Sequence, residues 1–363
     1  GADATLLARI VHPSAGIVAA VVSLIVGFAG PVAGAALALE TYLDPFLPSW
    51  LPDKLLGLTV ILGLTWLHGR DVAAGARSQD AITLPKVLVL AALGVIGIVL
   101  GSPGSIGGAD VSSAAAAFRS PSFPAAFILV AYAYSGWNGA SYVAGEVTDP
   151  ARNLPRSLIL GTAIVTGIYL LLNVAYLSAA PVSVLAGQDA VARVAATHLL
   201  GERAGLAIAL IIGLGYISAI GAWILAGPRV YAAVGETHPR LAWLGKRNPR
   251  GAPTAAVWFQ TAVTLVLFVR SELQDLLTFM GILLSLSSGL TVLGVIVLRI
   301  REPDLPRPYR VPLYPWLPIL SGGVLIWMIV LALMEDPNAA LWCGVTILAG
   351  IIATPLIRAG KSG

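Results

Sequence analysis

Long runs of apolar residues, separated by short polar segments, make up most of the chain. An α-helix needs roughly 20 residues to cross the hydrocarbon core of a bilayer, and most of the runs approach that length. The second run is the weakest, since its clean apolar stretch covers only Leu55 to Leu67. The pattern predicts an all-α integral membrane protein with ten spans, at residues 14–39, 51–67, 81–101, 123–145, 157–180, 204–226, 254–269, 276–298, 315–334 and 337–357.

The positions of the basic residues support this number of spans. With the N-terminus in the cytoplasm, all but five of the 22 Lys and Arg residues fall on the cytoplasmic side, the five being Lys54, Arg119, Arg193, Arg203 and Arg270. Membrane proteins keep such an excess of Lys and Arg inside. We therefore expect a multi-pass protein of the plasma membrane, or of the inner membrane in a bacterium, with both ends cytoplasmic. The formal charge of +4 reflects topology, and no nucleic acid is expected as a partner.

Composition excludes several other classes of protein. Hydrophobic residues make up 57% of the chain and charged residues only 11%, too few to cover a soluble globule. The single cysteine, Cys343, rules out a disulfide framework or a thiolate metal site. The four histidines (His12, His68, His198 and His238) fall in polar connections without metal-ligand spacing, and no phosphate-binding loop or nucleophile motif occurs. The chain is expected not to be an enzyme and to need no cofactor or metal.

The fourth span contains the most unusual intramembrane sequence, Tyr134-Ser135-Gly136-Trp137-Asn138-Gly139. It follows about 12 apolar residues, which at 1.5 Å each places it about 18 Å into the membrane. Secondary transporters build substrate sites from helices interrupted at this depth, because the freed backbone groups bind charged parts of the substrate. The alternative is that small residues only allow two helices to cross closely, as we expect at Gly30-x-x-x-Gly34 and Gly97-x-x-x-Gly101.

Lys86 is the second unusual residue. A helix beginning at Pro85 would leave residues 87–101, too short to cross, whereas a start near Ala81 places the ammonium inside the membrane. Intramembrane lysines are costly and usually functional. A lysine so near a helix end can also extend its side chain to the surface, and the residues alone favour neither interpretation.

Other polar residues within the spans favour a structural role. Serine hydroxyls in a helix commonly bond to the carbonyl one turn back. Pro31 is expected to kink the first span. The residues interpreted as structural are Tyr216, Ser218, Ser285, Ser287 and Ser288.

Four segments resemble one family of transporters. The sequence Ala131–Asn138, followed by Glu146–Arg156, resembles the sixth helix and following loop of amino acid permeases of the amino acid, polyamine and organocation (APC) superfamily. It is most similar to the L-type transporter branch and its bacterial relatives. Three further segments agree in order and topology, and the similarity covers nearly the whole chain: Ser78–Lys86, Gly227–Pro253 and Leu298–Tyr309.

The resemblance implies the LeuT-like fold of two inverted five-helix repeats. Members of the family have twelve helices, and the ten predicted spans correspond to the third to the twelfth. We therefore expect one transporter domain over residues 1–363 that lacks the first two helices, with 14–101 as the remainder of the first repeat, 123–298 as the second repeat and 315–357 as two additional helices. Family members hold substrate between interrupted first and sixth helices, and nothing here matches the first-helix turn.

The resemblance also implies roles for residues of the fourth span. Tyr132 takes the place of the aromatic residue that closes the family's site from outside. Ala133, Tyr134, Ser135 and Gly136 match the unwound segment whose backbone carbonyls receive the substrate's α-ammonium group.

Residues of other segments complete the implied site. Asn138 matches a polar position close to the substrate, and Ser285, with Leu284, falls where the tenth helix shapes the pocket. Lys86 matches a lysine whose ammonium occupies the place of a sodium ion in sodium-coupled relatives. This match favours a coupling role for Lys86, with proton coupling or exchange in place of sodium symport.

The sequence therefore predicts a secondary active transporter of amino acids that works by alternating access. Its expected partners are the amino acid, a proton or counter-transported amino acid, and the bilayer. A polyamine or amine transporter is the nearest alternative, although Asn138 is neutral where some relatives for cationic substrates carry Glu. A truncated fragment with an incomplete site, and more remotely a membrane enzyme, are the alternatives of other classes. Cys343 is in the wrong place for the family's disulfide-linked accessory subunit, so none is expected.

Overall fold

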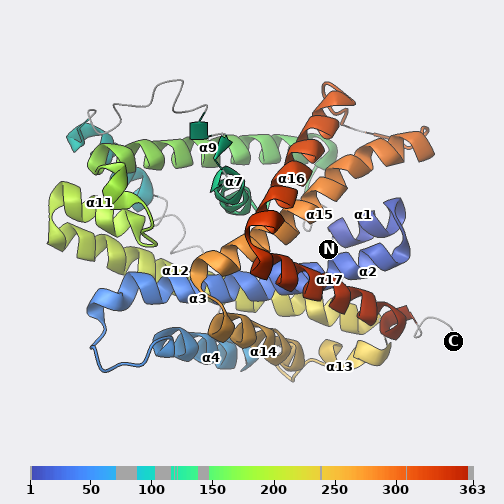
Figure 1. The fold of residues 1–363 in the computed structure, drawn as a ribbon. Coiled ribbons are helices and arrows are strands. Elements are labelled where there is room, and N and C mark those ends of the chain that lie inside the picture. The colour runs from blue at the N-terminus through green and yellow to red at the C-terminus, as the bar shows by residue number, and fades with distance from the viewer. Residues whose placement is uncertain are drawn as a thin grey trace.

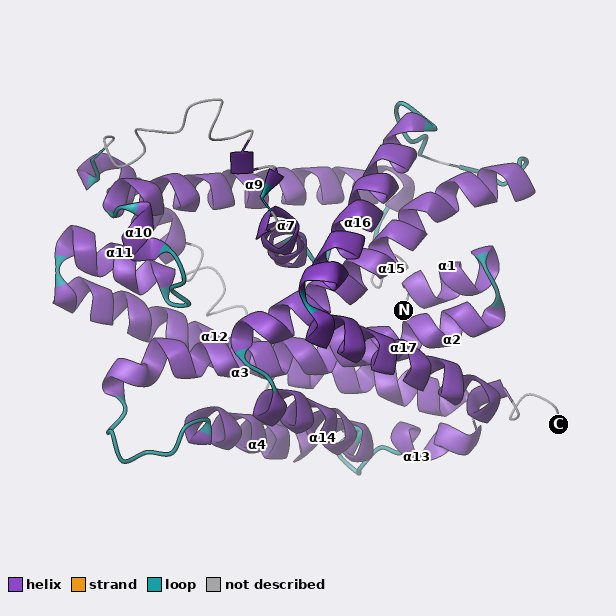
Figure 2. Cartoon of the chain, in the orientation of Figure 1, coloured by secondary structure: helices purple, strands orange, loops and turns teal. Residues whose placement is uncertain are grey.

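The computed structural model describes residues 2–70, 88–102, 116–117, 119–120, 122–137, 147–237, 239–307 and 309–358. Within these residues the regular elements are helices, with no strand. In chain order they are α1 (Ala2–Ile10), α2 (Pro13–Leu24), the π-helix η1 (Ile25–Ala29), α3 (Gly30–Leu43), η2 (Asp44–Phe46), α4 (Leu55–Arg70), the helix Leu88–Leu100, α7 (Ser122–Ala133), α9 (Pro150–Ala179), α10 (Val182–Leu185), α11 (Val191–Leu200), α12 (Glu202–Thr237), η5 (Pro239–Leu241), α13 (Ala242–Gly245), α14 (Thr254–Arg270), α15 (Leu273–Arg301), α16 (Trp316–Glu335) and α17 (Pro337–Arg358) (Figures 1 and 2).

Each of the ten predicted spans contains a helix in its described part. Six helical stretches of the described chain are long and apolar enough to cross a membrane, namely Pro13–Phe46, Pro150–Ala179, Glu202–Glu236, Leu273–Arg301, Trp316–Glu335 and Pro337–Pro355. The other four predicted spans appear as the shorter apolar helices α4, Leu88–Leu100, α7 and α14. The predicted all-α membrane fold is confirmed. The sequence pattern did not predict α1 and α11, because helices of nine and ten residues are too short to register as spans.

Helices α3 and α12 lie side by side through the middle of the bundle (Figure 1). A Cβ atom at Gly213 of α12 would lie 2.5 Å from Cδ2 of Leu43, so a larger residue there would require the Leu43 side chain to move. Leu39 of α3 and Ile220 of α12 are fully buried in the main hydrophobic core. The other spanning helices are arranged around this pair.

Glycines set the closest helix crossings, as predicted. At Gly97 of the helix Leu88–Leu100, a Cβ atom would lie 2.5 Å from Cβ of Ala175 on α9. A Cβ atom added at Gly101 would lie 2.6 Å from Cβ of Ser178, also on α9. Small residues let two backbones approach this closely. The approach is close enough for a backbone hydrogen bond, in which the Ser102 N–H donates to the Ser178 carbonyl at 3.0 Å. The interpretation of Gly97 and Gly101 as a close crossing is confirmed.

The irregularity expected at Pro31 takes the form of a π-helical turn. Helix η1 ends at Ala29, two residues before Pro31, and α3 continues from Gly30 in the same direction. Proline lacks the N–H that would bond to the carbonyl four residues earlier, and its ring clashes with that carbonyl in a regular helix. A π-helical turn widens the helix where this clash would arise. The Thr264 hydroxyl donates to the Ala29 carbonyl at 3.2 Å and ties the turn to α14.

His68 does not lie in a polar connection, and that expectation was wrong. It belongs to the last turn of α4 and is buried, with Nε2 3.4 Å from the position of a Cβ atom at Gly221 of α12. Ile61 and Thr65, at helical spacing before it, are also buried, so His68 continues the packed face of α4. Its Nδ1 atom has no hydrogen-bond partner within the described residues.

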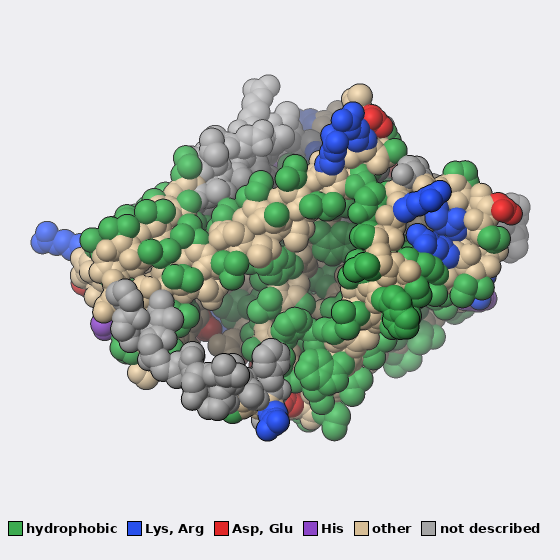
Figure 3. All heavy atoms as spheres, turned by 90° about the horizontal axis from the view of Figure 1, so that it is seen from above, with side chains coloured by type: hydrophobic (Ala, Val, Ile, Leu, Met, Phe, Trp, Pro, Cys, Tyr) green, Lys and Arg blue, Asp and Glu red, His purple; other side chains and the backbone are tan. Residues whose placement is uncertain are grey.

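Charged side chains are concentrated away from the middle of the molecule. On the face drawn in Figure 3, hydrophobic side chains cover the centre, and more of the Lys and Arg side chains lie toward the side of α1 than toward the opposite end. Exposed apolar side chains are what a bilayer requires of the surface that it contacts.

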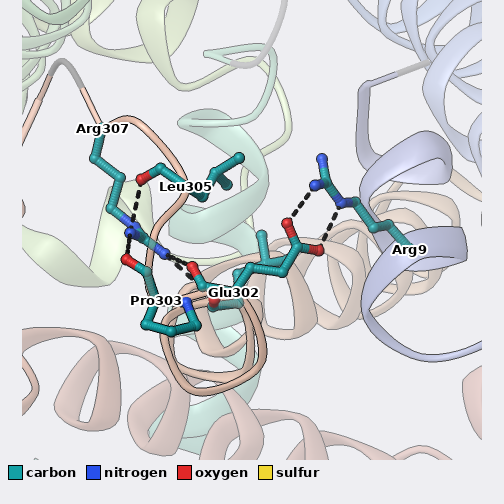
Figure 4. A network of polar contacts seen from close by, with 6 residues as sticks. Arg9, Glu302, Pro303, Leu305 and Arg307 are labelled. Atoms are coloured by element: carbon teal, nitrogen blue, oxygen red, sulfur yellow. Dashed lines mark hydrogen bonds and ion pairs between the residues drawn. The ribbon is translucent and has the colours of Figure 1, made fainter.

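Arginines close the end of α15 (Figure 4). Arg307 donates to four backbone carbonyls, those of Leu298, Glu302, Pro303 and Leu305, at 2.6 to 3.3 Å. Of these four carbonyls only that of Leu298 belongs to α15, and it also accepts from the Glu302 N–H at 2.9 Å. The guanidinium therefore mainly holds the loop after α15 against the end of the helix. Arg9 of α1 forms an ion pair with the Glu302 carboxylate, which fastens α1 to the same end.

We expect Arg307→Ala to destabilise the protein more than Arg9→Ala. The Arg9–Glu302 pair is 54% and 35% exposed, and exposed pairs contribute about 0–1 kcal/mol. Loss of Arg307 leaves the carbonyls of Pro303 and Leu305 without this donor, which costs about 1–2 kcal/mol, whereas the Leu298 and Glu302 carbonyls keep backbone N–H donors. Thermal unfolding of the purified protein in detergent measures the difference. Equal shifts of the two midpoints would contradict the role of Arg307 in holding the loop after α15.

Candidate functional site

Helix α7 ends at the predicted sequence. Its last helical residue is Ala133, and residues 134–137 form a turn in which Gly136 has φ of 91°. This left-handed conformation is open to glycine and strained for other residues. The Ser135 N–H donates to the Tyr132 carbonyl at 2.8 Å, three residues back, which tightens the helix end. The helix therefore ends where the sequence predicts a break, and residues 138–146 lie outside the described residues.

Helix α9 supports the interrupted end of α7. The Tyr169 hydroxyl donates to the Ala133 carbonyl at 2.9 Å, and the Tyr134 hydroxyl donates to Oγ1 of Thr166 at 3.1 Å. The rings of Tyr134 and Tyr169 meet edge to face, with centroids 5.2 Å apart. The Ala133 carbonyl is thus oriented by a neighbouring helix, and because a carbonyl has two lone pairs it can accept a second donor.

Helix α15 packs against the other side of α7. A Cβ atom at Gly281 would lie 2.6 Å from Cγ2 of Ile128 and 2.9 Å from the Ile128 carbonyl oxygen, so the two backbones are in close contact. It would also lie 3.4 Å from Cβ of Tyr132. Ser285 follows Gly281 by one helical turn and is buried. The structure therefore brings Tyr132 to the helix face that carries Ser285.

Tyr132 also approaches a group of tyrosines from three other helices. Tyr132 and Tyr216 of α12 pack against the same hydrophobic core. The rings of Tyr216 and Tyr42 of α3 have centroids 5.9 Å apart, and Tyr176 of α9 packs in the cluster that contains Tyr42. Four helices thus contribute tyrosines to one region beside the interrupted helix.

Two further hydroxyls of α15 are candidates that the sequence reasoning did not single out for function. Ser287 Oγ and Thr291 Oγ1 are buried and have no hydrogen-bond partner within the described residues. They are four residues apart and lie on one face of α15. Serine and threonine in helices usually bond to the preceding turn, so two unpaired hydroxyls on one face are uncommon and mark a surface able to take a polar group.

The remaining predicted residues are distributed as follows. Ser135 and Gly136 are exposed in the turn, and Tyr134 is partly buried. Asn138 and Lys86 lie outside the described residues. The polar groups that the structure places at the break are hydroxyls and carbonyls, all uncharged. Among the described residues, no group of three or more His, Cys, Asp and Glu side chains is placed to hold a metal ion.

Comparison with known proteins identifies similar sequences. The profile of a family described as amino acid permease matches residues 1–360. The large neutral amino acids transporter small subunit 2 of Mus musculus is 29% identical over 333 residues, which cover 90% of this chain and 62% of that protein. The b(0,+)-type amino acid transporter 1 of Homo sapiens is 27% identical over 308 residues, 84% of this chain and 62% of that protein. The Asc-type amino acid transporter 1 of Mus musculus is 27% identical over 327 residues, 88% and 60% respectively. The chain thus spans about three fifths of the length of the curated relatives that it matches.

Proposed function

Because the chain belongs to the amino acid permease family, we propose that it transports amino acids as a secondary active transporter working by alternating access. It is a multi-pass membrane protein, with apolar helices of membrane length. The proposed location is the plasma membrane, with both ends of the chain in the cytoplasm, and the proposed coupling is exchange or proton symport. Residues 14–101 and 123–298 are the proposed parts of two inverted repeats.

The interrupted end of α7 is the observation that carries the proposal. The turn at residues 134–137 leaves helix-end carbonyls available as acceptors for an α-ammonium group, at a position where Ser135 and Gly136 are exposed. Tyr169 holds one of these carbonyls in a fixed direction. Among the described residues, the polar groups at the break are uncharged, which suits a neutral amino acid better than a polyamine, whose several cations would call for carboxylates.

Tyr132 and Ser285 are the proposed side walls of the site. Tyr132 precedes the break and packs beside Gly281, while Ser285 lies one turn further along α15. In the proposed mechanism Tyr132 closes over the bound amino acid, and Ser285 with Leu284 contacts its side chain. Asn138 is the proposed polar contact after the break, and Lys86 the proposed coupling residue.

Transport by the purified full chain tests the proposal. Proteoliposomes loaded with unlabelled leucine should accumulate labelled leucine from outside, and those loaded with putrescine should not accumulate labelled putrescine. Accumulation of putrescine without leucine would favour the polyamine alternative. Failure to accumulate either compound, with protein that unfolds cooperatively, would contradict the proposal.

We expect Tyr169→Phe to weaken the apparent affinity for amino acid about fivefold, since one hydrogen bond contributes about 1 kcal/mol. The substitution keeps the ring against Tyr134 and removes only the donor to the Ala133 carbonyl. Tyr134→Phe is the matched control, because the Tyr134 hydroxyl bonds to Thr166 and not to a carbonyl of the break. The concentration dependence of uptake measures the apparent affinity of both variants. A larger loss of affinity in Tyr134→Phe than in Tyr169→Phe would show that the Ala133 carbonyl is not part of the site.

A further inference from the structure

A groove separate from the break in α7 lies between α14, the start of α15 and the first half of α17. Residues of α14, α15 and α17 all line it. The groove has a volume of about 430 Å³, within the range of small-molecule sites, and none of its lining residues belongs to α7. Its walls are mainly apolar, formed by Val263, Val266, Leu267, Trp342 and Val345.

One end of the groove carries charges of both signs. Arg270 is the last residue of α14, Asp275 is in the first turn of α15, and Asp336 precedes α17. The Asp336 carboxylate accepts from the N–H groups of Asn338 and Ala339 at 3.0 and 2.9 Å, which fixes its position.

Arg270 and Asp275 are available for a ligand. Within the described residues, neither forms an ion pair. The nearby cation Lys54 is already engaged, because its ammonium donates to the Ser271 carbonyl at 3.0 Å and lies 3.5 Å from the Glu272 carboxylate. The charged end of the groove therefore has one guanidinium and two carboxylates.

The apolar walls extend from this charged end along the direction of the spanning helices. At 1.5 Å per residue the lining runs about 10 Å along α14, from Arg270 to Val263, and about 20 Å along α17, from Asp336 to Ala349. Val266, Trp342 and Val345 are 62%, 53% and 45% exposed, so the groove opens sideways toward the lipid. A groove with a charged end and apolar walls of this length matches a phospholipid, which has a charged headgroup and long acyl chains.

We propose that this groove binds one phospholipid with a zwitterionic headgroup that carries an ammonium. Arg270 binds the phosphate, since a guanidinium matches phosphate oxygens well. Asp275 and Asp336 bind the ammonium, and an acyl chain lies along Val266 and Val345. Two carboxylates against one guanidinium make the end of the groove net negative, which disfavours an anionic headgroup. Trp342 lies near the start of α17 and lines the groove, and tryptophan near a span end commonly contacts lipid headgroups.

Lipid retention by the purified full chain tests this site. In native mass spectrometry after exchange into detergent with added lipid, the protein should retain one phosphatidylethanolamine and bind phosphatidylglycerol about tenfold more weakly. Arg270→Gln should weaken phosphatidylethanolamine binding about tenfold through loss of the charge-assisted contact. Arg270 is exposed and forms no ion pair in the described chain, so the variant should fold.

A pair of tryptophan variants on α17 tests whether the apolar part of the groove holds the acyl chain. Val345→Trp fills the groove and should abolish retention, whereas Leu348→Trp, at a 54% exposed position that does not line the groove, should retain lipid as the unmodified protein does. Equal retention by the two tryptophan variants would overturn the proposal. So would preference of the unmodified protein for phosphatidylglycerol, or unchanged binding in Arg270→Gln.

Discussion

Replacing Gly136 by alanine is expected to lower the rate of amino acid uptake roughly tenfold, because a left-handed backbone costs about 1–3 kcal/mol for other residues. Gly136 has φ of 91°, and a Cβ atom there would meet no heavy atom within 4 Å. The effect would therefore come from the backbone and not from a clash. Alanine would drive the turn at residues 134–137 toward a helical or extended conformation, and the carbonyls of the break would change direction. The loss of activity is measured as the initial rate of labelled leucine uptake into proteoliposomes.

Gly161→Ala and Gly167→Ala are the matched controls. Both glycines lie within α9 without a positive φ, and a Cβ atom added at either would meet no heavy atom within 4 Å. Alanine favours the helix at such positions by about 0.5–1 kcal/mol, so uptake should be unchanged and stability slightly higher. If Gly136→Ala transports as well as these controls, the conformation of the break has no role in transport.

Gly281→Ala is expected to abolish most transport and to lower the stability of the protein by about 1–3 kcal/mol, the usual cost of overpacking. The new Cβ atom would lie 2.9 Å from the Ile128 carbonyl oxygen, which belongs to a helix backbone and cannot rotate away. Helix α7 would have to move from α15 and carry Tyr132 with it. The thermal unfolding midpoint and the uptake rate should therefore fall together.

Gly323→Ala on α16 is the control for replacing a helical glycine by alanine without a clash. A Cβ atom at Gly323 would meet nothing within 4 Å, so neither stability nor uptake should fall. A wild-type midpoint for Gly281→Ala would mean that α7 and α15 separate easily, and Tyr132 would then lose its fixed position beside α15.

Much of the fold could be predicted because its determinants are local. Spans appear in the sequence as apolar runs of fixed minimum length, and each of the ten contains a helix in its described part. The break in α7 was also visible, since Gly136 lies between polar residues in an apolar run. The spacing of Gly97 and Gly101 indicated a close helix crossing, because two glycines four residues apart lie on one face of a helix. The sequence did not indicate that α9 was the partner.

The parts that the sequence did not reveal depend on which helices meet. Tyr169 looks like one more aromatic residue of a span, and its bond to the Ala133 carbonyl exists only because α9 passes beside the end of α7. His68 was assigned to a connection because polar residues follow it, whereas its burial comes from packing against Gly221. The unpaired hydroxyls of Ser287 and Thr291 likewise require knowledge of the surrounding helices.

The central claim is that carbonyls at the interrupted end of α7 receive the α-ammonium of the substrate. Competition against labelled leucine for binding to the purified full chain tests it most directly, with unlabelled leucine and its desamino analogue 4-methylpentanoate as competitors. Leucine should displace the label, and the desamino analogue, which lacks the ammonium group, should fail to do so at a hundredfold higher concentration, a difference of about 2.8 kcal/mol. Displacement by the analogue as effectively as by leucine would contradict the account.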